Sequence, residues 1–201
     1  MVPALNTLPS DIRRQKILKI LSCYEDKEFV RLSLGNDIVV RERLTPPSTY
    51  IESVLHIKHE DYKSFIPISS VGHGPVNALS KEIVSLLRNR YQFADRLNLL
   101  EFKIDTNHKR GSIKTNSNVT TTLIVSVDHR EVLSFRATSH SILEASLSSV
   151  LQMFELYMNA EKSINKINML LDSYRKRNRG DLYTTALLDL SNLVSCTCYK
   201  S

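Results

Sequence analysis

The spacing of apolar and polar positions changes several times along the 201-residue chain. Ser10 or Asp11 can cap a first helix, in which apolar residues recur at helical spacing up to Leu21. From Phe29 to Leu34 the pattern alternates as in a strand, and residues 50–58 and 64–70 alternate in the same way. A helix should follow at once, because the apolar residues of 76–87 fall on a single stripe.

The same order of elements then repeats. Residues 97–104, 120–127 and 132–137 alternate, and Ser141 and Glu144 form a capping box that starts a second long helix. The pattern therefore predicts an α+β fold of two pseudo-repeated βββα units, in which antiparallel sheets pack with helices. One unit alone is too small to cover its sheet, so we expect the units to pack together or across a homodimer.

These elements divide the chain into three parts. The boundaries expected are an N-terminal helical segment (1–28), a domain of two units (29–163, with units 29–91 and 97–163) and a C-terminal helical extension (164–201). Within the extension, Gly180 separates two predicted helices.

Composition excludes several classes of protein. No apolar run approaches the roughly 20 residues that cross a bilayer, and the N-terminus lacks the pattern of a secretory signal, so we expect a cytoplasmic protein with no membrane partner. The net charge of +6 includes a basic cluster at 175–179. That cluster lacks interleaved aromatic residues and suits a helix end, so nucleic-acid binding is the less favoured interpretation.

Metal or redox chemistry is not indicated either. The three cysteines form neither a disulfide framework nor a zinc motif, because only one residue separates Cys196 from Cys198. His56 and His59 lie three apart in a predicted strand and should face opposite sides. We predict no cofactor, no metal and no catalytic residue.

The best candidate for a binding site is the segment from Gly72 to Ala78. Gly74 can cap the helix that follows, and Pro75 suits its first position. Free amides at such a helix start attract an anion such as a carboxylate, which suggests a seat for a small ligand. A purely structural interpretation, in which both glycines serve a turn and a cap, stands beside it.

A second segment, Ser139 to Ser146, lies at the corresponding place in the second unit. Together with Leu99 to Phe102, the two segments resemble the C-terminal allosteric (dimerisation) domain of 2-isopropylmalate synthase and citramalate synthase, over roughly residues 29 to 160. The resemblance implies a dimer that binds leucine or isoleucine as a feedback inhibitor near the two helix starts. The residues that would form this effector site are Gly72, His73, Gly74, Pro75, Val76, Asn77, Ala78, Ser139, His140, Ser141, Ile142 and Ala145. Leu79 would add to the apolar wall.

This chain departs from the family at two positions, because Asn77 and Ser141 stand where the family typically has aspartate. It also has no room for the catalytic (β/α)₈ barrel of about 250 residues. We therefore expect no enzyme activity from this chain alone. It would regulate a separate catalytic synthase subunit or, as a fragment, form part of an acyltransferase. The alternatives are a structural dimerisation module that has lost its ligand and a basic nucleic-acid-binding protein.

Overall fold

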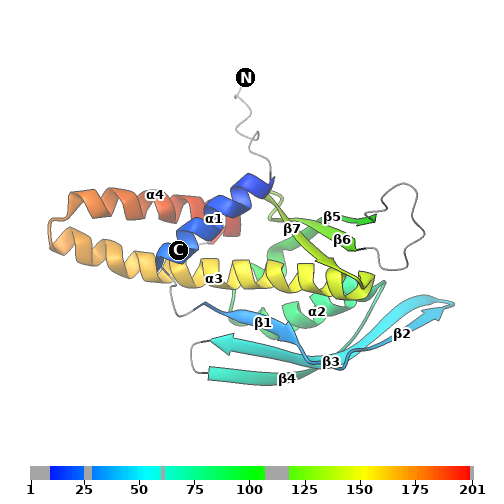
Figure 1. Ribbon diagram of the computed structural model, residues 1–201. Coiled ribbons are helices and arrows are strands. Elements are labelled where there is room, and N and C mark those ends of the chain that lie inside the picture. The colour runs from blue at the N-terminus through cyan, green and yellow to red at the C-terminus, as the bar shows by residue number, and fades with distance from the viewer. Residues whose placement is uncertain (1–9, 25–28, 60–61, 107–117, 200–201) are drawn as a thin grey trace.

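The computed structural model describes residues 10–24, 29–59, 62–106 and 118–199. It confirms the predicted α+β class, with helices and two antiparallel sheets arranged in layers (Figure 1). The helices are α1 (Ser10–Tyr24), α2 (Pro75–Leu87), the short 3-10 helix η1 (Ala94–Arg96), α3 (Ile142–Lys176) and α4 (Gly180–Thr197).

The first sheet has four strands, one more than the sequence predicted for the first unit. They are β1 (Arg31–Leu34), β2 (Val39–Leu44), β3 (Pro47–His59) and β4 (Tyr62–Gly72). The long strand β3 pairs with β1 and β2 along one edge and with β4 along the other. The unexpected strand, β2, lies in what reads as a polar connection. Most of its residues are exposed, so it has no buried face to impose an alternating pattern.

The second sheet has the three strands predicted, in the order β5-β6-β7. They are β5 (Leu97–Thr106), β6 (Val119–Val127) and β7 (Val132–Ser139). In the turn between the last two strands, Asp128 and His129 have positive φ angles of 49° and 55°. Every residue of the central strand β6 is buried or partly buried, so this sheet contributes strongly to the core.

Helices α2 and α3 lie between the two sheets, where their apolar faces form the core (Figure 1). Leu79 and Ile83 of α2 are almost fully buried, and so are Phe154 and Tyr157 of α3. Phe93, which precedes η1, stacks on Tyr157 with ring centroids 5.3 Å apart. Helix α3 continues without a break through the predicted boundary between 163 and 164, so the division into domain and extension stays a prediction.

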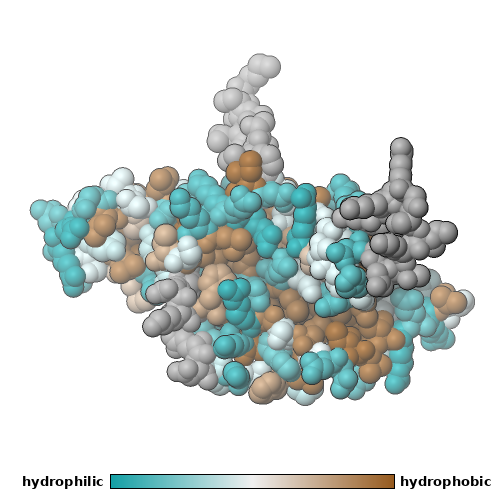
Figure 2. Space-filling model, in the orientation of Figure 1, coloured by the Kyte–Doolittle hydropathy of each residue, from teal (hydrophilic) through white to brown (hydrophobic). Residues whose placement is uncertain are grey.

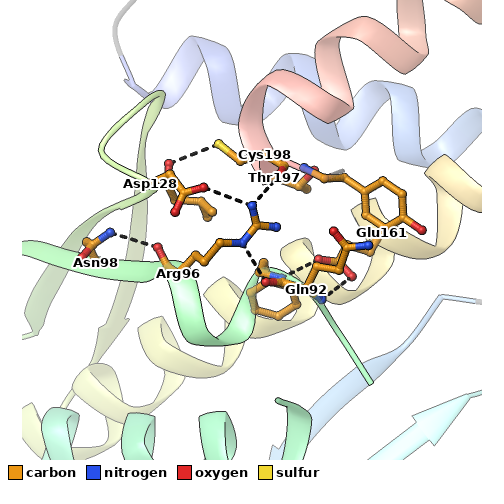
Figure 3. A network of polar contacts seen from close by, with 10 residues as sticks. Gln92, Arg96, Asn98, Asp128, Glu161, Thr197 and Cys198 are labelled. Atoms are coloured by element: carbon orange, nitrogen blue, oxygen red, sulfur yellow. Dashed lines mark hydrogen bonds and ion pairs between the residues drawn. The ribbon is translucent and has the colours of Figure 1, made fainter. Parts of the chain in front are cut away.

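Beyond the sheets, α3 and α4 run side by side as a hairpin (Figure 1). Near the C-terminal end of α4, a polar network ties this hairpin to the second sheet (Figure 3). There, Arg96 donates from Nη1 to the Asp128 carboxylate at 3.0 Å and to the Cys198 carbonyl at 2.8 Å. Nearby, the buried Glu161 carboxylate accepts from the backbone N–H groups of Gln92 and Phe93 at 2.9 and 2.6 Å. These contacts fix the hairpin to the segment that leads into β5.

Candidate functional site

The start of α2 has the geometry that its sequence predicts. Gly74 occupies the N-cap position and Pro75 the first helical position. The amide of Ala78 donates to the Gly74 carbonyl at 2.9 Å, which closes the first turn. No side chain caps this end, and its first turn holds no acidic residue. The helix start is therefore uncapped and carries no compensating negative charge.

The glycine just before this helix start has a structural explanation. A Cβ atom built on Gly72 would lie 2.5 Å from the Ala78 nitrogen and 2.6 Å from the Asn77 side-chain oxygen. That oxygen also accepts from the His73 N–H at 3.2 Å. The end of β4 thus packs directly on the first turn of α2. The space beside Gly72 is filled by the chain itself, whereas a Cβ on Gly74 would meet nothing within 4 Å.

The start of α3 is capped by side chains. Ser141 is the N-cap, and its Oγ accepts from the Glu144 N–H at 3.3 Å, as the predicted capping box requires. The Glu144 carboxylate accepts from the Ser139 hydroxyl, and Ser139 Oγ in turn accepts from the Ser141 N–H at 3.2 Å. Serine at the family's aspartate position therefore still closes this helix start.

A groove lies along each of the two helices. Groove A, about 640 Å³, lies between α2 and strands β5 and β6. Its lining residues are Asn77, Ser80, Lys81, Val84, Arg88, Leu97, Asn98, Leu99, Leu100, Leu123, Val125, His129 and Met153. Groove B, about 650 Å³, lies between α3 and the region of β1. Its lining residues are Leu32, Ser33, Leu34, Gly35, Asn36, Ile38, Ser141, Leu143, Glu144, Leu147, Ser148, Leu151, Gln152 and Glu155.

The two grooves occupy equivalent places in the pseudo-repeat. When the N-caps Gly74 and Ser141 are superposed in sequence, every lining position of α2 coincides with a lining position of α3. Asn77, Lys81, Val84 and Arg88 of α2 then correspond to Glu144, Ser148, Leu151 and Glu155 of α3. In each groove the helix of one unit faces the first strand of the other. Both volumes fall within the range of small-ligand sites.

Their charges are opposite. Among the described residues, the lysines, arginines, aspartates and glutamates that line groove A are Lys81 and Arg88, and those that line groove B are Glu144 and Glu155. Apolar residues of α3 and β1 form the wall of groove B. Figure 2 shows apolar side chains gathered below α3, with hydrophilic residues around them. Groove B thus offers negative charge beside an apolar surface.

One carboxylate of groove B also holds the fold together. Gly35 donates to the Val54 carbonyl at 2.8 Å, so the N–H groups of Val30 and Leu32 point away from β3, toward α3. Glu155 accepts from Leu32 N–H at 2.6 Å, and burial raises the pKa of Glu155 despite this bond. Asn159 accepts from Val30 N–H and donates to the Val30 carbonyl, at 2.8 and 3.0 Å. These side chains satisfy the free edge of β1.

Two of the twelve predicted site residues line a groove, one in each. Asn77 lines groove A and Ser141 lines groove B; the other ten line neither groove. Val76, Ala78 and Ala145 are buried in the core, as is Leu79, which was expected in the pocket wall. Asn77 and Ser141 therefore lie in separate grooves of the chain. Five lining residues, Leu143, Leu147, Leu151, Lys81 and Arg88, were not among the predicted site residues. Spacing along a helix shows which face each of them occupies, but whether that face lines a groove depends on where β1 and β5 lie.

The basic cluster lies at the turn between α3 and α4. Arg175 donates to the Tyr183 hydroxyl at 3.2 Å, and Arg179 forms an ion pair with Asp181 at 3.3 Å. Two of its cations thus have partners in the adjacent turn of the chain.

Neither a metal site nor a membrane-spanning helix is found among the described residues. No group of three or more His, Cys, Asp and Glu side chains is arranged to hold a metal ion, and no helix there has the length and apolarity of a membrane span.

The chain was compared with known proteins. No family model matches it, and a search of curated proteins finds no match. The resemblance to the synthase domain accordingly rests on the residues quoted above.

Proposed function

We propose that this chain is a regulatory, dimerising domain that senses a branched-chain amino acid, leucine or isoleucine, in groove B. The observation that carries the proposal is the composition of groove B, which places Glu144 at a helix start beside an apolar wall. The order of the elements supports it as well, because each unit ends in a helix whose start carries one of the two motifs.

Groove B suits each part of an amino acid. The ammonium group would lie near Glu144, and the aliphatic side chain would contact Leu143, Leu147 and Leu151. The carboxylate would accept from N–H groups of the first turn of α3, since Ser141 satisfies only one of them directly. Binding would be passed to a catalytic synthase subunit in the cytoplasm, as feedback inhibition of branched-chain amino acid synthesis.

Calorimetric titration of the full chain with leucine, isoleucine and valine tests the proposal. We expect heat of binding at millimolar ligand for at least one of them. Glu144→Gln should weaken it about tenfold or more, because the ammonium group loses a charged partner while the amide oxygen can still accept from Ser139. Glu82→Gln, on a helix position that lines neither groove, is the matched control. No heat and no thermal shift with any of the three would rule out sensing.

A second candidate is a dimerisation module without a ligand. The packing of Gly72 against Ala78 and the Asn77–His73 hydrogen bond favour it, because they explain much of the first motif without an effector. Restoring aspartate with Asn77→Asp and Ser141→Asp separates the two. A gain of amino-acid binding in the double variant supports a sensing domain that is weakened by these two replacements. A stable dimer without any gain supports the structural module.

A further inference from the structure

Groove A has features that amino-acid sensing in groove B does not use. Its wall is largely apolar and comes from three parts of the fold: Val84 of α2, Leu123 and Val125 of β6, and Met153 of α3. Leu99 and Leu100 on β5 are about half exposed, at 49% and 48%. The groove is therefore an open apolar surface that the chain leaves partly uncovered.

An irregularity in β5 builds part of this wall. The pairing of β5 with β6 shifts register between Leu99 and Glu101, so Leu100 is an extra residue in the strand. In a regular strand, consecutive side chains point to opposite faces. Here the bulge lets Leu99 and Leu100 both line groove A. Bulges of this kind re-aim side chains and are common beside functional sites.

The charge of groove A is positive and incompletely compensated. Lys81 is exposed and, among the described residues, has no ion-pair or hydrogen-bond partner. Arg88 has only a loose contact, 3.9 Å from Nε to the Asp95 carboxylate, with both side chains more than half exposed. No aspartate or glutamate lines the groove within the part of the chain that the structure describes. An anion bound there would meet attraction from both cations without repulsion from the lining.

We infer that groove A binds an aliphatic monocarboxylate that lacks an ammonium group. The carboxylate pairs with Lys81, and the aliphatic chain covers Leu99 and Leu100. An amino acid is disfavoured, because its ammonium group would enter a groove whose charged lining residues are both cations. Groove B, lined by Glu144 and Glu155, has the opposite charge and would disfavour such an acid. This site does not depend on the proposed amino-acid sensing.

Calorimetry with leucine and two of its analogues tests the assignment on the full chain. The compound 4-methylpentanoate is leucine without its ammonium group, and 3-methylbutylamine is leucine without its carboxylate. We expect 4-methylpentanoate to bind once per chain and 3-methylbutylamine not to bind in groove A. Lys81→Met should weaken 4-methylpentanoate about tenfold or more, because it removes the charge and keeps the apolar stem. Lys58→Met, on an exposed position of β3, controls for net charge.

Three results would overturn the inference. They are absence of 4-methylpentanoate binding at millimolar concentration, equal weakening by Lys81→Met and Lys58→Met, and displacement of 4-methylpentanoate by leucine in direct competition. Sedimentation of the Leu99→Asn variant, which measures its oligomeric state, adds a further test. Loss of a dimer in this variant would place a second copy of the chain on groove A and would also refute the assignment. Binding of 4-methylpentanoate with no response to leucine would instead confirm groove A and refute amino-acid sensing in groove B.

Discussion

Replacing Gly72 by alanine tests how closely β4 approaches the start of α2. The added Cβ would lie 2.5 Å from the Ala78 nitrogen and 2.8 Å from its Cα. Both contacts are with backbone atoms, so a side-chain rotation cannot relieve them. The first turn of α2 would have to move, although Ala78 and Leu79 are fully buried there.

The expected cost combines two terms. Overpacking a well-packed site costs about 1–3 kcal/mol. Replacing glycine also reduces the entropy of the unfolded chain, which returns about 0.4–1 kcal/mol. We therefore expect Gly72→Ala to lower the free energy of unfolding by about 1.3 kcal/mol, the difference between the midpoints of these two ranges. At Gly180, where α4 begins, an added Cβ would meet nothing within 4 Å. Only the stabilising term applies there.

Urea denaturation followed by circular dichroism compares the two variants with the parent chain. Gly72→Ala should shift the midpoint to lower urea and Gly180→Ala should leave it unchanged or raise it. If Gly72→Ala is as stable as Gly180→Ala, then β4 does not pack on α2 as described, and the structural explanation of Gly72 is wrong.

Three further predictions concern α3 and can be measured with the same denaturation assay. Ser141→Ala removes the N-cap oxygen that accepts from Glu144 N–H and should cost about 1 kcal/mol; an unchanged midpoint would contradict the cap. Asn159→Ala leaves the buried N–H and C=O of Val30 unpaired and should cost about 2–6 kcal/mol, since each lost partner costs about 1–3 kcal/mol; an unchanged midpoint would contradict these bonds. Burial raises the pKa of Glu161 above its ordinary 4.5, so the folded protein holds this proton more tightly than the unfolded chain. Its contribution is therefore greatest at low pH and is lost as pH rises from 4.5 through the raised value; Glu161→Gln should remove this part of the pH dependence, and an unchanged pH profile would refute the assignment.

Sequence periodicity was sufficient for most of the fold because most elements bury one face. The stripe of α2 and the alternation of β6 and β7 led directly to the two units. Strand β2 was not predicted, because Arg41, Glu42 and Arg43 are all exposed and no alternation of buried and exposed residues marks the strand. It is a strand because it pairs with β3. Pairing with a neighbour, rather than burial, defines such a strand.

The candidate site was only partly predictable for a related reason. The motifs identified both helix starts, and the N-cap roles of Gly74 and Ser141 are confirmed. The grooves, however, depend on which strand of one unit faces the helix of the other. Lys81 lies on a polar face in sequence, and only the position of β5 makes it part of a groove. A local pattern contains no information about that long-range contact.

The most direct test of the central claim is calorimetric titration of the full chain with leucine and isoleucine, carried out in parallel on Glu144→Gln. The account predicts saturable binding of at least one amino acid at one site per chain, weakened about tenfold or more in the variant. Absence of heat with both ligands, or binding that the variant leaves unchanged, would contradict the assignment of groove B as an amino-acid sensor.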